Sequence, residues 1–583
     1  MSIAETKELM DVALGLGKAD LVVYNGSLLN VYTGEFIEKC SVSVKGEKIA
    51  YVGRKPEDTI GNKTVVIDAG GKTIIPGLID GHAHLAWLYN ISEFLKYVIP
   101  GGTTTIITES MEVYPVLGYE GVLDFLDSLR DQPIKIFATA PAMVSISSLA
   151  RGVPKKTIKK LLARKDILGL GETYWQALLQ DPDYLLSSFD ETLAAGKKLE
   201  GHSAGASEKK LAAYVASGIS SCHEPINAKE VIERLRLGLF VMIREGSIRR
   251  DLEEISKIKN LSVNLRRLAL VTDGVTPKDL IEKGYMEFIV QKAIDCGFDP
   301  VASVQMATLN VAEHFSLDNM IGGIAPGRYA DMLIIPNPLT IKAEYVISKG
   351  KIIAEKGKLL SSPREHNFSE ASRNSIKLPG RLKSSDFEIK FENGGLQAEV
   401  RVIDQITELV TKEIKIVLPV VDGKINSDTS LDIIKVAAID RNNSPGKIFT
   451  GLVKGFGMKS GAIASSAAWD TSDIIVAGAN DADMACAVNR IKALQGGCVV
   501  CDRGKILAEL PLPLFGIISD TPVEVIARQI DEVNKAASGL GILFSDPMLT
   551  LVTLTGAAIP YLRICEEGLF NLKEGKSAGL FVK

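Results

Sequence analysis

The alternation of β-type and helical segments between residues 73 and 274 is the feature that most constrains how this chain can fold. Eight apolar, β-branched runs lie at 73–85, 102–110, 134–142, 167–173, 198–206, 218–225, 239–247 and 268–274. Helical patterns with apolar residues three and four positions apart separate several of these runs. Alternating elements form parallel sheets, and eight strands over about 250 residues are what a (β/α)8 barrel requires. We therefore predict an α/β fold with a TIM-like barrel over residues 73–323.

Two β-rich segments flank the predicted barrel. Residues 19–56 contain short β-branched stretches separated by NG, TG and KG turn signals, which predict a meander of hairpins. A similar pattern returns at 324–354, again punctuated by Gly and Pro. Because the two segments can pair with each other, we predict one composite β domain built from residues 1–72 and 324–365.

The remainder of the chain predicts a linker and a further domain. Residues 366–395 are polar and indicate a boundary. Beyond them come a strand pattern at 413–421, a Gly-rich stretch at 451–466 and a helical pattern at 481–494. We predict that residues 396–583 form a separate α+β domain.

Composition excludes several classes of protein. The 67 Lys and Arg against 71 Asp and Glu give a net charge of −4, so there is no bulk positive field to attract nucleic acid. Seven cysteines are an odd and sparse set, which favours a reducing compartment. The first residues lack the pattern of a signal peptide, and no run approaches the ~20 apolar residues of a membrane helix. We expect a cytoplasmic protein that binds neither nucleic acid nor membranes.

Four of the six histidines stand at the ends of predicted strands, together with two carboxylates. These residues are His82, His84, Glu172, His202, His223 and Asp273. The carboxyl ends of barrel strands converge on one mouth, so we expect these side chains to meet there. Imidazole and carboxylate suit Zn, Mn, Fe or Co, and six ligands are too many for one tetrahedral ion with an open position. The set predicts two divalent ions bridged by Glu172.

The alternative for any one of these histidines is a hydrogen-bonded structural role, which is the commoner fate of a lone His at a strand end. Four of six histidines at strand ends, with His82 and His84 in HxH register, favour the metal site. His314 and His366 lie outside the set, and we predict that both are structural or solvated.

The strand-end residues belong to a series of motifs. In chain order these are PGLIDGHAHL, GTTTIITE, GLGET, LEGHSAG, SSCHEP, MIREGS and VTDG. In this combination the chain resembles the metal-dependent amidohydrolase superfamily, and within it the adenine deaminase family. The second resemblance extends into the last domain, where VKGFGMKSGAIASSAAWD, GANDADMACAVNRI and LAELPLPLFGIIS are similar to the C-terminal region of adenine deaminases. It covers nearly the whole chain.

The resemblance implies a ligand set and a reaction. His82, His84, His202, His223 and Asp273 are expected to bind metal and Glu172 to bridge two ions, with manganese first and iron or zinc as alternatives. The expected reaction is hydrolytic deamination of adenine to hypoxanthine and ammonia by attack of a metal-bridging hydroxide on C6, as in purine salvage. We also expect a small-molecule purine or related heterocycle as substrate and a homo-oligomeric assembly.

Two carboxylates are predicted to move protons. Asp273 is placed to take the proton of the nucleophile and pass it to the leaving amine. Glu224, directly after His223, is predicted to protonate the ring nitrogen, with the orientation of a neighbouring group as its alternative role.

Four further residues are predicted to bind substrate: Arg244, Glu245, Ser247 and Glu112. The first three come from MIREGS at the end of the seventh predicted strand. For Arg244 and Glu245 the alternative is an ion pair with each other at the barrel rim.

The chain also departs from the adenine deaminase pattern. Ala86 stands where a carboxylate is expected, Gly274 follows Asp273 in place of a second acid, and residues 109–112 read ESME where the family has DPHE. In the last domain, residues 469–473 are WDTSD in place of HDSHN. None of these changes removes a predicted metal ligand. The alternatives are therefore a divergent amidohydrolase acting on another amino-heterocycle or cyclic amide, and a non-catalytic paralogue.

Overall fold

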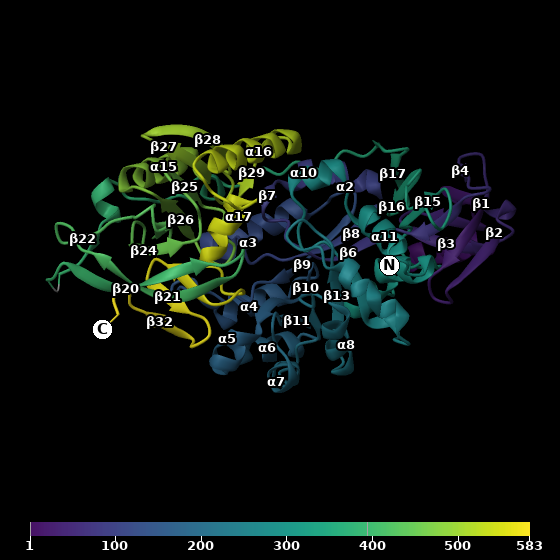
Figure 1. Ribbon diagram of the computed structural model, residues 1–583. Coiled ribbons are helices and arrows are strands. Elements are labelled where there is room, and N and C mark those ends of the chain that lie inside the picture. The colour runs from purple at the N-terminus through teal and green to yellow at the C-terminus, as the bar shows by residue number, and fades with distance from the viewer. Residues whose placement is uncertain (1, 393, 583) are drawn as a thin grey trace.

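The computed structural model describes residues 2–392 and 394–582. Figure 1 shows a purple and teal β-rich body at one end of the molecule, the barrel in the middle, and a green to yellow α+β body at the other end. Among the described residues, no helix combines the length and the apolar character needed to cross a membrane.

A nine-stranded sheet joins the two β-rich segments that flank the barrel. After α1 (Ile3–Ala13), its strands are β1 (Leu21–Asn30), β2 (Glu35–Lys45), β3 (Lys48–Gly53), β4 (Val65–Asp68), β5 (Thr73–Pro76), β15 (Met332–Ile335), β16 (Tyr345–Ser348), β17 (Lys351–Glu355) and β18 (Lys358–Leu359). The order is β18-β17-β16-β15-β5-β1-β2-β3, with β4 paired to β1. The junction is the antiparallel pairing of β15 with β5, so chain segments on either side of the barrel share one sheet.

Eight parallel strands build the barrel, and each falls within one of the predicted runs except β10, which extends one residue beyond its run. They are β6 (Leu78–Ala83), β8 (Thr103–Thr108), β9 (Lys135–Ala140), β10 (Ile167–Tyr174), β11 (Lys198–His202), β12 (Ser221–Cys222), β13 (Phe240–Arg244) and β14 (Leu268–Val271). They form two ladders, β11-β10-β9-β8-β6 and β12-β13-β14. Backbone hydrogen bonds from Ser220 to Leu199 (2.9 Å) and from Asp273 to His82 (3.1 Å) link the ladders. The predicted barrel is confirmed.

Helices connect the strands and cover the outside of the barrel. They are α2 (Ile91–Gly101), α3 (Tyr114–Leu129), α4 (Lys155–Leu162), α5 (Trp175–Gln180), α6 (Pro182–Ala194), α7 (Glu208–Ala216), α8 (Ala228–Arg236), α9 (Leu252–Ile255), α10 (Pro277–Glu282), α11 (Met286–Asp295), α12 (Pro300–Met306) and α13 (Leu309–His314). Their apolar faces pack on the strands: Ile158 and Leu161 of α4 and Val231 of α8 are buried.

The run at 73–85 was predicted as one strand, and this was wrong. The chain bends after Pro76, so that β5 pairs in the nine-stranded sheet while β6 enters the barrel. Gly77 permits the bend because a Cβ at this position would lie 2.2 Å from Thr104 Oγ1. The consequence is that β6 starts at a fixed point and carries its HxH motif to the barrel mouth.

The last part of the chain forms an eight-stranded sheet of order β21-β20-β24-β23-β26-β25-β27-β28. Its strands are β20 (Gln397–Gln405), β21 (Thr411–Pro419), β23 (Ile433–Asp440), β24 (Ile448–Lys454), β25 (Ala462–Ser465), β26 (Asp473–Gly478), β27 (Gly497–Asp502) and β28 (Lys505–Pro511). The principal helices are α15 (Asp481–Leu494), α16 (Val523–Gly539) and α17 (Pro547–Val552), and β30 (Leu562–Cys565), β31 (Gly568–Asn571) and β32 (Lys576–Ala578) form a small separate sheet. The predicted helix at 481–494 is confirmed.

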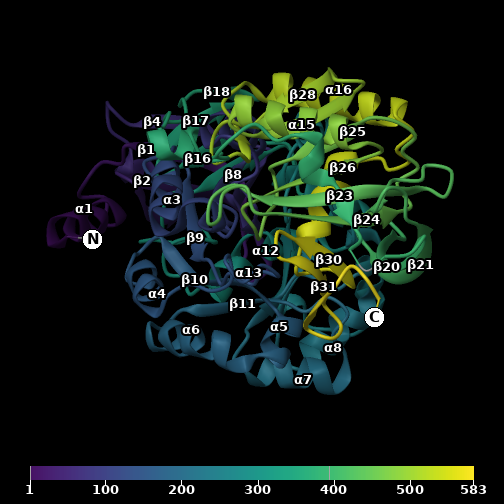
Figure 2. The ribbon, with the colours of Figure 1, turned by 90° about the vertical axis from the view of Figure 1, so that its left-hand side faces the viewer.

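This C-terminal body contacts loops that follow barrel strands. Its short strand β29 (Ile518–Ser519) pairs in parallel with β7 (Leu88–Tyr89), in the segment after β6. Ser147, in the segment after β9, donates to Glu566 (2.8 Å). Figure 2 shows the green and yellow elements lying against the blue barrel elements. Because these loops leave the carboxyl ends of the strands, the C-terminal body covers the barrel mouth.

Candidate metal centre

The strand-end histidines and carboxylates gather around one oxygen atom of Glu172. Glu172 Oε1 lies 3.0 Å from His82 Nε2 and 3.1 Å from His84 Nε2. The same oxygen lies 3.3 Å from His223 Nε2. Asp273 Oδ1 lies 3.2 Å from His82 Nε2 and 3.4 Å from His84 Nε2. Residues from four strand ends thus meet in one buried cluster.

The cluster divides into overlapping groups that share a carboxylate. One consists of His82, His84, Glu172 and Asp273, and the other of Glu172, His202 and His223. In each group the ligand atoms lie within 4.8 Å of one another. Glu172 is the only member of both, which is the position a bridging ligand needs. A third group, His223 with Glu224 and Asp273, makes Glu224 an additional possible ligand that the sequence had not indicated.

Three observations test whether this cluster fits divalent metal. Two ligand atoms bound at about 2.0–2.1 Å to one ion lie about 3.0–3.4 Å apart, and the His to carboxylate distances above fall in that range. His82 Nε2 and His202 Nδ1 are buried and have no hydrogen-bond partner of acceptable geometry among the described residues. Although burial opposes it, Asp273 and Glu172 raise the pKa of His82 to about 10, so the carboxylates leave negative charge that a cation would neutralise. The residues of the cluster therefore fit divalent metal ions.

Local structure explains why these side chains converge. His82 and His84 are two residues apart at the end of β6, so strand alternation places both on the same face. Asp273 follows β14 with φ at 61°, in the left-handed region that Asp tolerates better than most residues. Its backbone N–H donates to His82 O (3.1 Å), which ties the two strand ends together.

Two further carboxylates contact the outer ring nitrogens of the HxH pair. Glu112 Oε1 lies 2.5 Å from His84 Nδ1, and Glu109 Oε1 lies 3.8 Å from His82 Nδ1. Thr139 donates to Glu109 Oε2 (2.8 Å), and burial raises the pKa of Glu109 to about 7. A hydrogen bond such as that between Glu112 and His84 sets the tautomer and direction of a metal-binding imidazole. The sequence predicted that Glu112 binds substrate, and the structure places one of its oxygens on His84, while Oε2 has no partner within the part of the chain that the structure describes.

Removal of the Glu112 carboxylate is expected to weaken metal binding. Glu112→Ala leaves His84 Nδ1 without its acceptor, and losing such a contact typically lowers metal affinity about 10- to 100-fold. Competition between the protein and a chelator for manganese measures the change. Glu112→Gln, whose amide oxygen can still accept, should recover part of the affinity. Affinity in Glu112→Ala equal to that of the unaltered protein would show that Glu112 does not position His84.

Arg244 joins the carboxylates on the other side of the cluster. Its Nη1 donates to Glu224 Oε1 and to Asp273 Oδ2, the latter at 3.2 Å, and its Nη2 donates to Asp251 Oδ2 (3.2 Å). Burial alone would raise the pKa of Glu224, but the Arg244 guanidinium lowers it to about 2. Burial opposes ionisation of Asp273 as well, but hydrogen bonds from His82 and His84, and then the charge of Arg244, hold the pKa of Asp273 well below its usual range.

Glu245 and Ser247, the other two MIREGS residues predicted to bind substrate, lie away from the cluster. Glu245 pairs with Lys292 (2.6 Å) and accepts from Leu252 N (3.3 Å), so the alternative ion pair with Arg244 is not formed. Ser247 donates to Asp279 (2.7 Å). His314 and His366, predicted to be structural or solvated, bond to carboxylates outside the cluster, His314 to Glu200 and His366 to Asp124.

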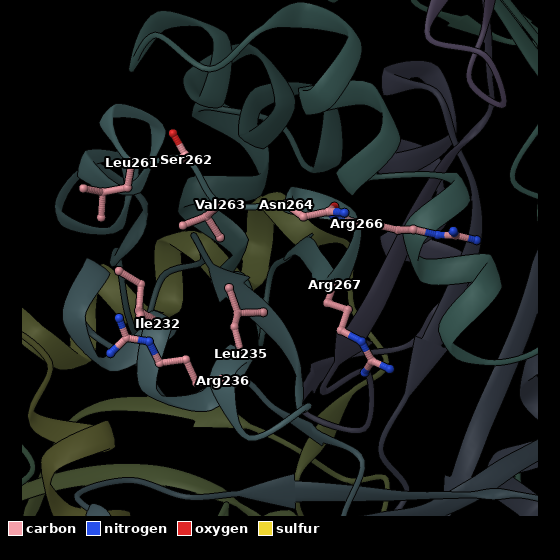
Figure 3. A pocket seen from close by; sticks show the side chains of 9 residues that line it. All are labelled: Ile232, Leu235, Arg236, Leu261, Ser262, Val263, Asn264, Arg266 and Arg267. Carbon is pink, nitrogen blue, oxygen red and sulfur yellow. The ribbon is translucent and has the colours of Figure 1, made fainter.

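A large surface cavity lies away from the metal cluster. It measures about 660 Å³ and is lined by residues that include Leu235, Leu261 and Arg267, from α8 and the segment before β14. Figure 3 shows these side chains around it. None of them is a cluster residue, and Arg267 donates to Gly238 O within this region. Its size alone therefore does not make it the site of chemistry.

The sequence did not predict two aromatic neighbours of the cluster. Tyr174 packs edge-on against His202, with ring centroids 4.9 Å apart, and only its position two residues after Glu172 could have indicated this. Trp469, from the C-terminal body, stacks on His84 at 5.4 Å and 13°. Residues 469–473 differ from the adenine deaminase pattern, but this difference did not indicate where Trp469 would lie.

Comparison with known proteins identifies the class of the barrel. Residues 73–354 match the Amidohydrolase family. The barrel and the His, Glu and Asp cluster at its mouth define the chain as an amidohydrolase, a class that uses divalent metal.

A second family match and individual similar proteins identify the family within the amidohydrolases. Residues 408–576 match the adenine deaminase C-terminal domain. The chain is 35% identical to an adenine deaminase of Moorella thermoacetica over 99% of this chain and 98% of that protein. It is 36% identical to one from Dehalococcoides mccartyi, with 98% of each chain covered, and 34% identical to one from Clostridium botulinum, with 99% and 98% covered. The chain belongs to the adenine deaminase family.

Proposed function

We propose that this protein hydrolyses adenine to hypoxanthine and ammonia at the cluster centred on Glu172. The observation that carries hydrolysis is the single Glu172 oxygen within 3.3 Å of three imidazoles, which is a geometry for two ions sharing one carboxylate. The full-length similarity to proteins described as adenine deaminases supports adenine as the substrate. The reaction cleaves the C–N bond of a cyclic amidine.

The proposed metal ligands follow the two groups. His82, His84 and Asp273 would hold one ion, His202 and His223 would hold the other, and Glu172 would be shared between them. Manganese is the proposed metal. Iron or zinc are the alternatives, because imidazole and carboxylate ligands can bind all three metals. When bound, such ions act as Lewis acids that make a water molecule nucleophilic near neutral pH.

Asp273 is proposed to transfer protons. Its Oδ1 faces the histidines and its Oδ2 is held by Arg244, so the carboxylate is ionised and aimed at the cluster. In the balanced reaction the water oxygen bonds to C6 and one water proton goes to the ring nitrogen. The other proton passes through Asp273 to the amine, and the C6–N bond breaks to release ammonia.

Glu224 is proposed to position its neighbours. Its Oε1 lies 3.2 Å from both His202 Nε2 and His223 Nε2 and accepts from Arg244. With a pKa near 2 the carboxylate is ionised at neutral pH, which favours orientation over donation of a proton to the ring. Arg244 holds this arrangement together.

The test is turnover by protein loaded with manganese. Adenine should lose ammonia and yield hypoxanthine, metal analysis should find about two ions per chain, and a chelator should abolish activity that added manganese restores. A panel of other amino-purines and cyclic amides is assayed in parallel. Turnover of a panel member with adenine inert would contradict the substrate and retain the chemistry. Loaded protein that turns over nothing in the panel would favour a non-catalytic paralogue.

A further inference from the structure

Beside the metal cluster lie buried polar atoms with no protein partner. Among the described residues these include Trp87 Nε1, Glu112 Oε2, Trp469 Nε1 and Asp470 Oδ1. Two are hydrogen-bond donors, and two belong to carboxyl groups. Trp87, Glu112 and Asp470 are at most 3% exposed. An unpaired buried polar group costs free energy, so such atoms beside the cluster call for a partner from outside the chain.

Contacts around His84 bring Trp469, Trp87 and Glu112 together at the metal cluster, and Asp470 directly follows Trp469 in the chain. The Trp469 ring lies parallel to His84, with centroids 5.4 Å apart and an interplanar angle of 13°. Trp87 meets Trp469 edge-on at 5.3 Å. Glu112 binds the same His84 through its other oxygen. Trp469 lies between β25 and β26 of the C-terminal sheet, so the C-terminal body reaches the metal cluster directly.

Asp470 is anchored by one oxygen and free at the other. Its Oδ2 accepts from Ala557 N (2.7 Å), which fixes the carboxyl plane. Burial, together with the charge of Glu172, raises the pKa of Asp470 to about 7. The free oxygen can therefore accept from a ring N–H, or donate to a ring nitrogen when the carboxyl is protonated.

We propose that Trp469 and Asp470 bind the substrate ring, with the indole stacking on its face and the free Asp470 oxygen bonding to its edge. The ligand class is a planar nitrogen heterocycle that carries both N–H donors and ring nitrogen acceptors. The edge of such a ring carries donors and acceptors for the Trp87 N–H and the unpaired carboxyl oxygens of Glu112 and Asp470, while its face lies parallel to the Trp469 indole. The inference rests on the proposed function and assigns part of substrate recognition to the C-terminal body.

Binding of the product tests the proposal separately from turnover. Hypoxanthine is titrated into manganese-loaded protein by calorimetry, and kcat and KM for adenine are measured on the same samples. Asp470→Asn keeps the size of the side chain and can still accept from Ala557 N. We expect it to weaken hypoxanthine binding and raise KM by about tenfold or more, with metal content unchanged. Trp469→Ala, which removes the stacking surface, should weaken binding by at least as much.

Matched variants control for general damage. Trp175→Phe alters a partly buried indole whose Nε1 donates to Ala204 O, and Asp546→Asn alters an acid that caps α17. Both should bind hypoxanthine as the unaltered protein does. If Asp470→Asn and Trp469→Ala also bind it normally, the proposal is wrong. Failure of the unaltered protein to deaminate adenine overturns the proposed function instead, so the two ideas fail by different measurements.

Discussion

Glu172→Ala is expected to lower adenine turnover by more than about 10³-fold and to reduce bound metal from about two ions per chain to one or fewer. Glu172 Oε1 lies close to His82, His84 and His223 at once, at 3.0, 3.1 and 3.3 Å. No other carboxylate belongs to both the first and second ligand groups. Without it, the two halves of the site lose their shared ligand.

Metal analysis and steady-state kinetics on the same preparation measure this effect. Glu200→Gln is the matched control, because Glu200 is also a buried barrel carboxylate bonded to a histidine, with Oε1 2.8 Å from His314 Nε2. That pair lies outside the cluster, so the control should retain its metal and its activity. A Glu172→Ala protein that holds two ions and turns over normally would rule out Glu172 as the bridge.

The eight barrel strands and the six strand-end residues could be predicted because their signals are local. Each strand is a short apolar run, and the rarity of histidine makes its position at a strand end informative. The helix at 481–494 was also predictable, since Asn480 caps its start by accepting from Asp483 N and Gly496 follows its end. Strand topology then brings the ligands together without further information.

Features that depend on docking between distant segments could not be predicted. The stacking of Trp469 on His84 requires the C-terminal sheet to sit over the barrel mouth, and no local pattern encodes that placement. Likewise, Glu245 follows Arg244 directly, yet strand alternation sends them apart, and Glu245 meets Lys292 on α11 instead.

The second large effect is expected for Asp273→Asn, which should lower kcat by about 10²- to 10⁴-fold, the usual contribution of a positioned general acid–base group. The amide retains the size of the side chain and an oxygen that can face His82 and His84, but it cannot accept the proton of the attacking water. Because Arg244 holds Oδ2 at 3.2 Å, the carboxylate is already oriented before substrate arrives.

Separating proton transfer from metal binding requires two readouts. If Asp273 acts mainly on protons, Asp273→Asn should keep most of its metal and show a fall in kcat with little change in KM, because the lost interaction belongs to the transition state. Asp251→Asn serves as the graded comparison, since Asp251 accepts from Arg244 Nη2 (3.2 Å) and from Arg249 (3.1 Å) rather than contacting the cluster, and its replacement should cause a much smaller loss. Equal losses of kcat in both variants would show that the loss arises from the hydrogen bonds of Arg244 and not from proton transfer by Asp273. Loss of metal in Asp273→Asn in proportion to activity would reduce Asp273 to a ligand, and the proton would then have to leave by another group.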